Sequence, residues 1–325
     1  MTSGRHTYIR PISILISVVL SFQLLHAQSD ILARLHDAEE LWNKGEYGQT
    51  LGILEPLARS AGSESPDMGR VWILLGSIYQ DLGRLSEAQR AYQSAISLCK
   101  GQPGRQREEE VALDNLGSLY LETGQLEMSK RLRLKVLRMA QAAGDHAVLA
   151  RIYNNLTAIA VRQRDPDEVR RWLSHAFAEV ELVPKVGADD LAAIHSNAGW
   201  LSMHDHDYEQ ASQHYAVALQ SLIEQHGTNH PLTGWGYVVR GRTRALMGNA
   251  GQGLEDVEMG LAIIEKTVGT DVPVYFAARL AYADTLSAAG SRKEAKAIRS
   301  TTKRSIDSFM HSTSSVYAIS ADAFR

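Results

Sequence analysis

Asparagine recurs at nearly constant intervals through the middle of the chain. Asn115, Asn155 and Asn197 follow one another at spacings of 40 and 42 residues. A carboxamide carries hydrogen-bond donors and an acceptor, which suits binding of the backbone of an extended peptide without reading its sequence. The alternative interpretation is that these side chains tie neighbouring helices of the protein to one another.

Arginine and tryptophan continue this polar stripe. Arg151, Asn155 and Arg162 stand at spacings of four and seven, so they share one face of a helix. Guanidinium groups pair bidentately with carboxylates, so this positive charge predicts an acidic or carboxylate-ended protein or peptide partner. The predicted groove residues are Asn115, Arg151, Asn154, Asn155, Arg162, Asn197, Trp200 and Arg242, with His204 and Trp235 on the same stripe. The alternative is solvated arginines beside tryptophans that pack in the core.

A group of histidines raises a metal hypothesis. His204, His206 and His214 stand close to Asp205 and Asp207, and imidazole with carboxylate suits zinc. Adjacent residues across a turn diverge in direction, so a closed site would require His214 to fold back. A metal-dependent enzyme built on this cluster is therefore an alternative only. Because the sequence lacks a phosphate-binding loop, a nucleophile elbow and a His-Glu-x-x-His helix, we expect no catalytic residues, no cofactor and no metal.

Helical hairpins must position these residues, because a helix-turn-helix pattern repeats seven times. The clearest copy reads Trp72-x-x-Leu75-Gly76-x-x-Tyr79-x-x-x-Gly83-x-x-x-x-Ala88-x-x-x-Tyr92-x-x-Ala95. Each copy has a small marker residue in its first helix, and successive markers are 38 to 42 residues apart. The markers are Ala38, Gly76, Gly117, Thr157, Gly199, Gly241 and Ala283. One hairpin cannot bury its own apolar face, so the copies are predicted to stack into a solenoid.

Two further positions keep the register of the repeat. Seven residues after the marker lies the predicted turn, at Gly45, Gly83, Gly124, Arg164, His206, Gly248 and Gly290. Glycine suits this turn because a tight connection between helices often needs a positive φ angle. Twelve residues after the marker, the second helix carries Thr50, Ala88, Ser129, Val169, Ala211, Gly253 and Ala295. Nearly all of these are small, which lets the paired helices approach closely.

Helix ends carry their own signals. Capping side chains, each with an acid or amide three residues later, predict the start of four second helices, at Ser86, Asp165, Asp207 and Ser291. A last helix from about Ala297 through Phe309 is predicted to cap the open end of the stack. Cys99 is the only cysteine, and its apolar register predicts a buried small residue rather than a reactive thiol.

These residues together resemble tetratricopeptide repeats. Spacings near 42, the Asn154-Asn155-Leu156 run and the His230-Pro231 pair before a repeat resemble the longer subtype found in kinesin light chains. The resemblance implies a right-handed α-solenoid of about seven hairpins with peptide-binding asparagines in its concave groove. It also implies that His226 and His230 have a structural role in the connection between two repeats.

The N-terminus and the charge bound the function further. Residues 1–27 carry Arg5 and Arg10, no acid, and an apolar run from Ile12 to Leu25, which is typical of a signal peptide cleaved after Ala27. The mature chain then has 32 basic and 37 acidic residues, a net charge of about −5, which argues against nucleic acid as a partner. An uncleaved leader that anchors the chain to a membrane is the alternative.

The sequence thus predicts an exported, periplasmic or secreted, non-catalytic scaffold that binds a protein or peptide, with no membrane contact beyond the signal segment. The signal peptide is 1–27, the array is 28–310 and the tail is 311–325. Repeats are expected to start near residues 31, 69, 110, 150, 192, 234 and 276. Besides the metal enzyme, a self-associating structural subunit remains an alternative function.

Overall fold

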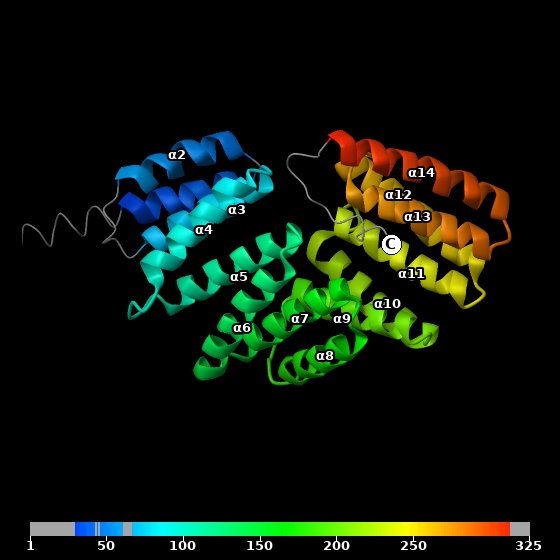
Figure 1. Cartoon of the computed structure of the whole chain (residues 1–325), viewed down its shortest axis with the longest axis horizontal. Helices are drawn as coiled ribbons and strands as arrows, with labels where there is room; N and C mark the ends of the chain where they lie inside the picture. The colour runs from blue at the N-terminus through cyan, green and yellow to red at the C-terminus, as the bar shows by residue number, and fades with distance from the viewer. Residues whose placement is uncertain (1–29, 43, 45, 61–66, 313–325) are drawn as a thin grey trace, which may run out of the picture. The chain divides into compact units, whose positions relative to one another are not determined.

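The computed structural model describes residues 30–42, 44, 46–60 and 67–312, and every regular element in these ranges is an α-helix (Figure 1). The first helix covers residues 30–42. The others are α2 (Tyr47–Ser60), α3 (Met68–Asp81), α4 (Leu85–Cys99), α5 (Gln106–Glu122), α6 (Leu126–Ala143), α7 (His146–Gln163), α8 (Pro166–Val180), α9 (Ala188–His204), α10 (Tyr208–His226), α11 (Pro231–Leu246), α12 (Ala250–Val268), α13 (Pro273–Ala288) and α14 (Arg292–Ser312). The predicted all-helical solenoid is confirmed.

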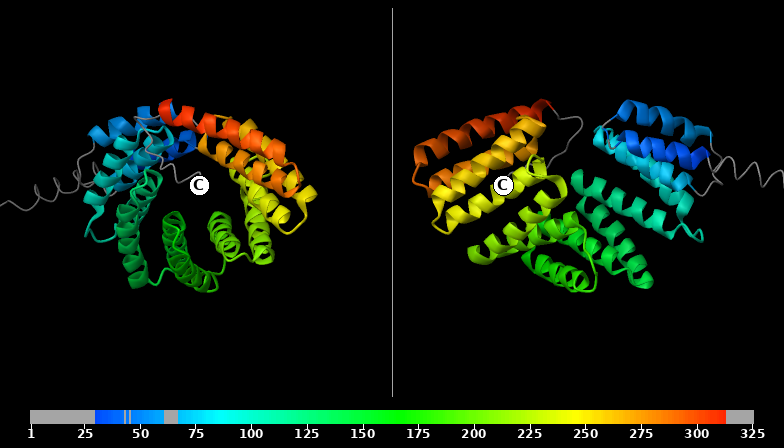
Figure 2. Two further views of the ribbon diagram at one scale, coloured as in Figure 1. Left: turned by 45° about the vertical axis from the view of Figure 1, so that its right-hand side comes forward. Right: turned by 180° about the vertical axis from the view of Figure 1, so that it is seen from behind.

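The chain divides into two compact units, residues 1–119 and residues 120–325. The boundary falls inside α5, so the first unit holds the helix of residues 30–42, α2, α3, α4 and most of α5. In the second unit each first helix packs on its own second helix, and first helices of successive copies also contact one another, as α7 does α9 and α11 does α13 (Figure 2). This arrangement places the first helices side by side along one face of the unit.

The predicted turn position adopts the backbone that its residues suggested. Gly83, Gly124, Gly248 and Gly290 have φ angles of 68°, 75°, 90° and 90°. Arg164 and His206, which replace glycine in copies four and five, have φ angles of 55° and 61°, and they are the non-glycine residues with positive φ in the described chain. Gly45 lies outside the described residues. The turn therefore keeps its left-handed geometry even where the sequence departs from glycine.

Small residues at the marker allow close approach between the two helices of a hairpin. A methyl group on Gly76 would lie 2.5 Å from the ring of Tyr92, and one on Gly199 would lie 2.6 Å from the ring of Tyr215. In copy six the neighbouring atom belongs to the backbone, because a methyl group on Gly253 would lie 2.6 Å from the backbone oxygen of Gly241. The small residues of the repeat are thus a packing requirement.

Two of the predicted caps form as expected. The carboxylates of Asp165 and Asp207 accept hydrogen bonds from the backbone N–H groups of Glu168 (2.9 Å) and Gln210 (3.0 Å). The prediction for Ser86 is wrong, because α4 begins at Leu85 and places this serine inside the helix. Arg84 occupies the cap position there and makes no side-chain cap hydrogen bond.

The ends of the chain differ from the expectation in one respect. Residues 297–309 do not form a separate capping helix, because α14 runs without a break from Arg292 to Ser312 and is also the second helix of copy seven. The predicted signal peptide, the residues of the tail after 312 and the start of the array before residue 30 lie outside the described residues. None of the described helices combines the length and apolar character that a membrane span requires.

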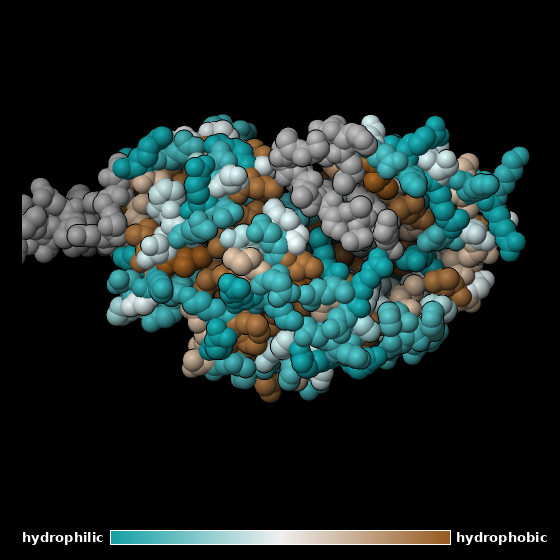
Figure 3. Space-filling model, in the orientation of Figure 1, coloured by the Kyte–Doolittle hydropathy of each residue, from teal (hydrophilic) through white to brown (hydrophobic). Residues whose placement is uncertain are grey.

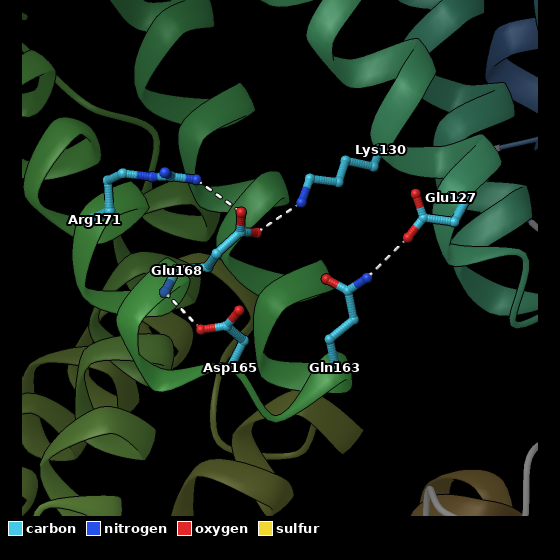
Figure 4. A network of polar contacts seen from close by, with 6 residues as sticks. All are labelled: Glu127, Lys130, Gln163, Asp165, Glu168 and Arg171. Atoms are coloured by element: carbon cyan, nitrogen blue, oxygen red, sulfur yellow. Dashed lines mark hydrogen bonds and ion pairs between the residues drawn. The ribbon is translucent and has the colours of Figure 1, made fainter.

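Polar contacts join copies three and four within the second unit. Figure 4 shows Lys130 of α6 facing the start of α8, where its Nζ lies 2.8 Å from Glu168. Arg171 contacts the same carboxylate at 2.8 Å, and Gln163 donates to Glu127 at 3.1 Å. The hydrogen bond from Lys130 lowers the pKa of Glu168. The space-filling view shows a mostly hydrophilic face with scattered hydrophobic groups (Figure 3), as expected of solvated outer helices.

Candidate functional site

A groove with a volume of ≈ 530 Å³ opens in the first unit. Its walls come from the helix of residues 30–42, from α3 and from α5, which are the first helices of copies one, two and three. The lining residues are Glu39, Trp42, Arg70, Ile73, Leu74, Ser77, Arg107, Glu108, Val111 and Asn115. We call this set the first-unit groove. Three successive repeats therefore contribute side chains to one concave site.

The apolar lining of the first-unit groove comes from all three helices. Trp42, Ile73, Leu74 and Val111 supply it. The indole N–H of Trp42 donates to Asp81 Oδ2 at 2.8 Å, so a contact between copies one and two fixes the orientation of the ring. An apolar surface with a fixed aromatic ring suits an aliphatic or aromatic side chain of a ligand.

Most of the charged residues that line the first-unit groove have an ion-pair partner, but one has none among the described residues. Arg70 contacts Glu39 at 3.0 Å, and Arg107 contacts Glu110 at 2.9 Å. Glu108 differs, because its Oε2 atom is enclosed and has no hydrogen-bond partner in the described part of the chain. One carboxylate of the first-unit groove is therefore left without a counter-charge.

Cys99 lies close to the base of the Glu108 side chain. A methyl group on Gly69 of α3 would lie 2.7 Å from Cys99 Sγ and 3.6 Å from Glu108 Cβ, so the three residues meet where α3, α4 and α5 pack. Burial raises the pKa of the Cys99 thiol, and the charge of Glu108 raises it further. The thiol is fully buried, as predicted.

The predicted asparagines fall into two groups. Asn115 lines the first-unit groove. In the second unit Asn197 Nδ2 donates to Asn154 Oδ1 at 2.8 Å, which joins α9 to α7. Asn154 is only 5% exposed, so its amide serves packing between repeats. Asn155 is half-buried on α7. At Asn154 and Asn197 the structure thus has the tie between helices that was the alternative to ligand binding.

The predicted arginines of the second unit all have partners on their own chain. Arg162 donates to the backbone oxygen of Leu121 at 3.4 Å, and Arg242 contacts Asp284 at 3.4 Å. Arg151 acts electrostatically on Asp190, where it opposes the rise in pKa that burial causes. An acidic ligand at these arginines would therefore have to displace existing contacts.

The remaining stripe residues and the histidines are dispersed. Trp200 stacks on His204 with ring centroids 5.8 Å apart, and both belong to α9. His206 contacts the hydroxyl of Tyr208 at 3.0 Å, whereas His214 pairs with His195 at 3.0 Å. The hypothesis of a His204–His214 metal cluster is thus wrong, because the three histidines have three separate partners. Across the described ranges, no three histidine, cysteine or carboxylate side chains form a group suited to a metal.

The connection before α11 uses its histidines structurally. His230 Nδ1 accepts a hydrogen bond from the backbone of Leu232 at 3.3 Å and so caps α11. Its ring stacks on His226, with centroids 4.3 Å apart, and His226 contacts Asp189 at 2.6 Å. These contacts link α10 to the starts of α9 and α11.

Sequence reasoning missed most of the first-unit groove. The missed residues stand at different distances from the markers of their copies. Trp42 follows its marker by four residues, whereas Arg70 precedes its marker by six and Glu108 by nine. The sequence contains a pattern that could have found them. Residues one helical turn from the asparagine position were selected as groove residues in copies four to six, but not in copies one to three. Extending the same stripe to every copy would have selected Arg70 and Val111.

The described chain contains seven successive helical hairpins, which define an α-helical repeat protein. Residues 67–132 and 108–178 match the tetratricopeptide repeat family, so this stretch is a tetratricopeptide repeat array. The kinesin light chain-related protein 1 of Arabidopsis thaliana is 25% identical over 184 residues, which make up 55% of this chain and 30% of that relative. The chain therefore resembles kinesin light chain repeats and spans less than a third of the relative.

Solved structures share the fold at low sequence identity. Apo RapI has a TM-score of 0.64 at 8% identity and covers 86% of this chain and 99% of its own. A Rap protein complexed with competence and sporulation factor has a TM-score of 0.56 at 12% identity, with coverages of 87% and 94%. A tetratricopeptide repeat protein from Parabacteroides merdae has a TM-score of 0.52 at 17% identity, with coverages of 87% and 99%. At these identities the likeness shows the α-solenoid fold alone.

Proposed function

We propose that this protein is a non-catalytic scaffold that binds an extended peptide or a partner helix in the first-unit groove. The observation that carries the proposal is the groove itself, to which three consecutive first helices supply both apolar and polar lining residues. Tetratricopeptide repeats are in general scaffolds for protein binding. The Rap protein solved with competence and sporulation factor is one protein of this fold with a bound partner.

A pull-down with a matched pair of variants tests the proposal. Val111→Lys places a charge in the first-unit groove, whereas Val217→Lys places the same charge on α10, where valine is 40% exposed. We expect crosslinked partners to be lost with Val111→Lys and kept with Val217→Lys. If the Val111→Lys variant captured the same partners as the wild type, the groove would not be the binding site.

A second candidate site is the stripe of Arg151, Asn155, Arg162, Asn197, Trp200 and Arg242 in the second unit. Its supporting observation is the stacked pair of half-buried Trp200 and exposed His204 on α9. We propose that it takes the acidic or carboxylate-ended ligand. The Arg151→Ala and Asn155→Ala double variant should then release an acidic partner, and retention of every partner would dismiss the site.

We further propose that the chain is exported and cleaved after Ala27. The arginines and the apolar run of residues 1–27 support this proposal. N-terminal sequencing of protein from the exported fraction should begin at Gln28. Recovery of the intact leader in the membrane fraction would favour the anchored alternative. Sizing chromatography of the exported protein would identify a self-associating structural subunit by a mass above that of one chain.

A further inference from the structure

We propose that the first-unit groove selects peptides in which an apolar side chain stands next to a basic one, and that Glu108 binds the basic side chain. The inference rests on the proposed function and adds the chemistry of the ligand. It also differs from the acidic ligand that the arginines of the second unit suggest.

The first step is the charge of the groove. Two of its four charged residues, Glu39 and Arg70, neutralise each other, and Arg107 is neutralised by Glu110. Glu108 has no ion-pair partner within the described ranges, and its Oε2 has no hydrogen bond. Oε2 itself is enclosed, but Glu108 as a whole is half-buried and lines the groove, so a ligand that enters the groove can supply the counter-charge that the described chain lacks. A carboxylate calls for a cation with N–H donors, namely lysine, arginine or a free amine.

The second step is the apolar surface beside Glu108. Val111 lies one helical turn after Glu108 on α5, and both line the groove opposite Ile73 and Leu74 of α3. A peptide side chain that covers Val111 and Ile73 therefore brings its sequence neighbour close to Glu108. Adjacent apolar and basic residues match this spacing, since the stem of lysine or arginine also covers apolar surface.

The third step is the cost of the wrong ligand. An acidic residue at the same place would add a second negative charge beside an uncompensated carboxylate, and like charges in a desolvated groove repel strongly. A neutral residue would leave Glu108 as it is. The expected order of binding is therefore basic, then neutral, then acidic.

Fluorescence anisotropy with four labelled peptides tests this order. The peptides share one flexible Gly/Ser frame with blocked ends and carry Leu-Lys, Leu-Gln, Leu-Glu or Gln-Lys at the centre. The chain from Gln28 to Arg325 should bind Leu-Lys about tenfold more tightly than Leu-Glu. It should bind Gln-Lys more weakly than Leu-Lys, because the apolar contact is lost.

Two variants assign the preference to one carboxylate. Glu108→Gln keeps the shape of the side chain and should reduce the preference for Leu-Lys over Leu-Glu to within about twofold. The control Glu87→Gln changes an acid on α4 that pairs with Arg84 at 3.1 Å, and it should leave the preference unchanged. Thermal unfolding of Glu108→Gln should occur at or above the wild-type temperature, because an unpaired charge has been removed.

The outcomes separate the two proposals. Equal binding of Leu-Lys and Leu-Glu, with Val111→Lys abolishing both, keeps the groove as a peptide site and overturns the selection of basic residues. Full selectivity in Glu108→Gln overturns the role of Glu108. Failure of all four peptides to bind up to about 1 mM overturns the inference, whereas the pull-down with Val111→Lys decides the proposed function of the groove by itself.

Discussion

Two histidines meet inside copy five, where copy three places two leucines. His195 of α9 and His214 of α10 contact each other through their Nδ1 atoms at 3.0 Å, and Phe177 of α8 lies against both rings. At the same register positions copy three carries Leu113 and Leu132. Burial lowers the pKa of both histidines, and His214 lowers the pKa of His195 further.

This pair predicts a loss of stability in acid. A base whose pKa is lower in the folded chain binds fewer protons there than in the unfolded chain, so stability falls as the pH drops below the ordinary value of 6.5. Double protonation also breaks the hydrogen bond, which is worth about 1 kcal/mol. Urea unfolding between pH 7 and pH 5 should show a smaller loss for His195→Leu with His214→Leu than for wild type. Parallel curves for the two proteins would contradict this assignment.

A buried carboxylate in copy six occupies the same register position as His214. Asp256 of α12 accepts two hydrogen bonds from Arg240, at 2.8 and 2.7 Å, and one from Arg244 at 2.8 Å. Arg244 stands at the register position that Tyr79 occupies in copy two, and this ion triad is the structural reason for an arginine there.

Removing Asp256 should be costly because it leaves two arginines without their counter-charge. We expect Asp256→Ala to lower the free energy of unfolding by about 3–5 kcal/mol in chemical denaturation. Glu255→Ala changes an exposed acid on the same helix and should shift it by less than about 0.5 kcal/mol. Similar losses for both variants would show that the triad contributes nothing particular.

Among the elements, α11 and α12 make the closest helix pair. Gly253→Ala should destabilise the chain by about 1–3 kcal/mol, because the new methyl group meets the backbone of Gly241 and Ala245 at 2.6 and 3.0 Å. Gly251→Ala is the control, since its methyl group meets nothing within 4 Å. That change should be neutral or stabilising by up to about 1 kcal/mol. Thermal denaturation of the two variants measures the difference.

The elements were largely predictable because they follow from local chemistry. The marker, the turn and the small residue of the second helix set one register, and the turn angles confirm it even at Arg164 and His206. The separate capping helix was wrong because nothing in the sequence interrupts residues 292–312. The cap at Ser86 failed because its helix already begins at Leu85.

The site was less predictable, since a side chain's role depends on which neighbour it reaches. Asn155 shares the register of Asn197, yet Asn197 hydrogen-bonds to Asn154, because the partner is set by how α7 packs on α9. His214 was grouped with residues near it in sequence, whereas its partner His195 comes from another helix. Asn115 lines the first-unit groove together with Leu74, which occupies the same register position in the preceding copy.

For the whole molecule, a repeat array predicts that damage stays local. In the second unit each helix contacts its neighbours in the stack, so Gly253→Ala should reduce amide exchange protection mainly in α11 and α12 and then in α10 and α13. Peptide binding in the first-unit groove should be unaffected at temperatures where the variant remains folded. Uniform loss of protection across the chain would instead indicate one cooperative unit.

Cys99 gives the chain an intrinsic reporter of groove occupancy. Because its fully buried thiol lies against Gly69 of α3 and close to Glu108 of α5, a thiol-specific reagent can reach it only when these helices separate. The rate of Cys99 labelling therefore reports how often the first unit opens at this residue. A ligand that bridges α3 and α5 should slow that rate, so occupancy can be timed in the unmodified protein.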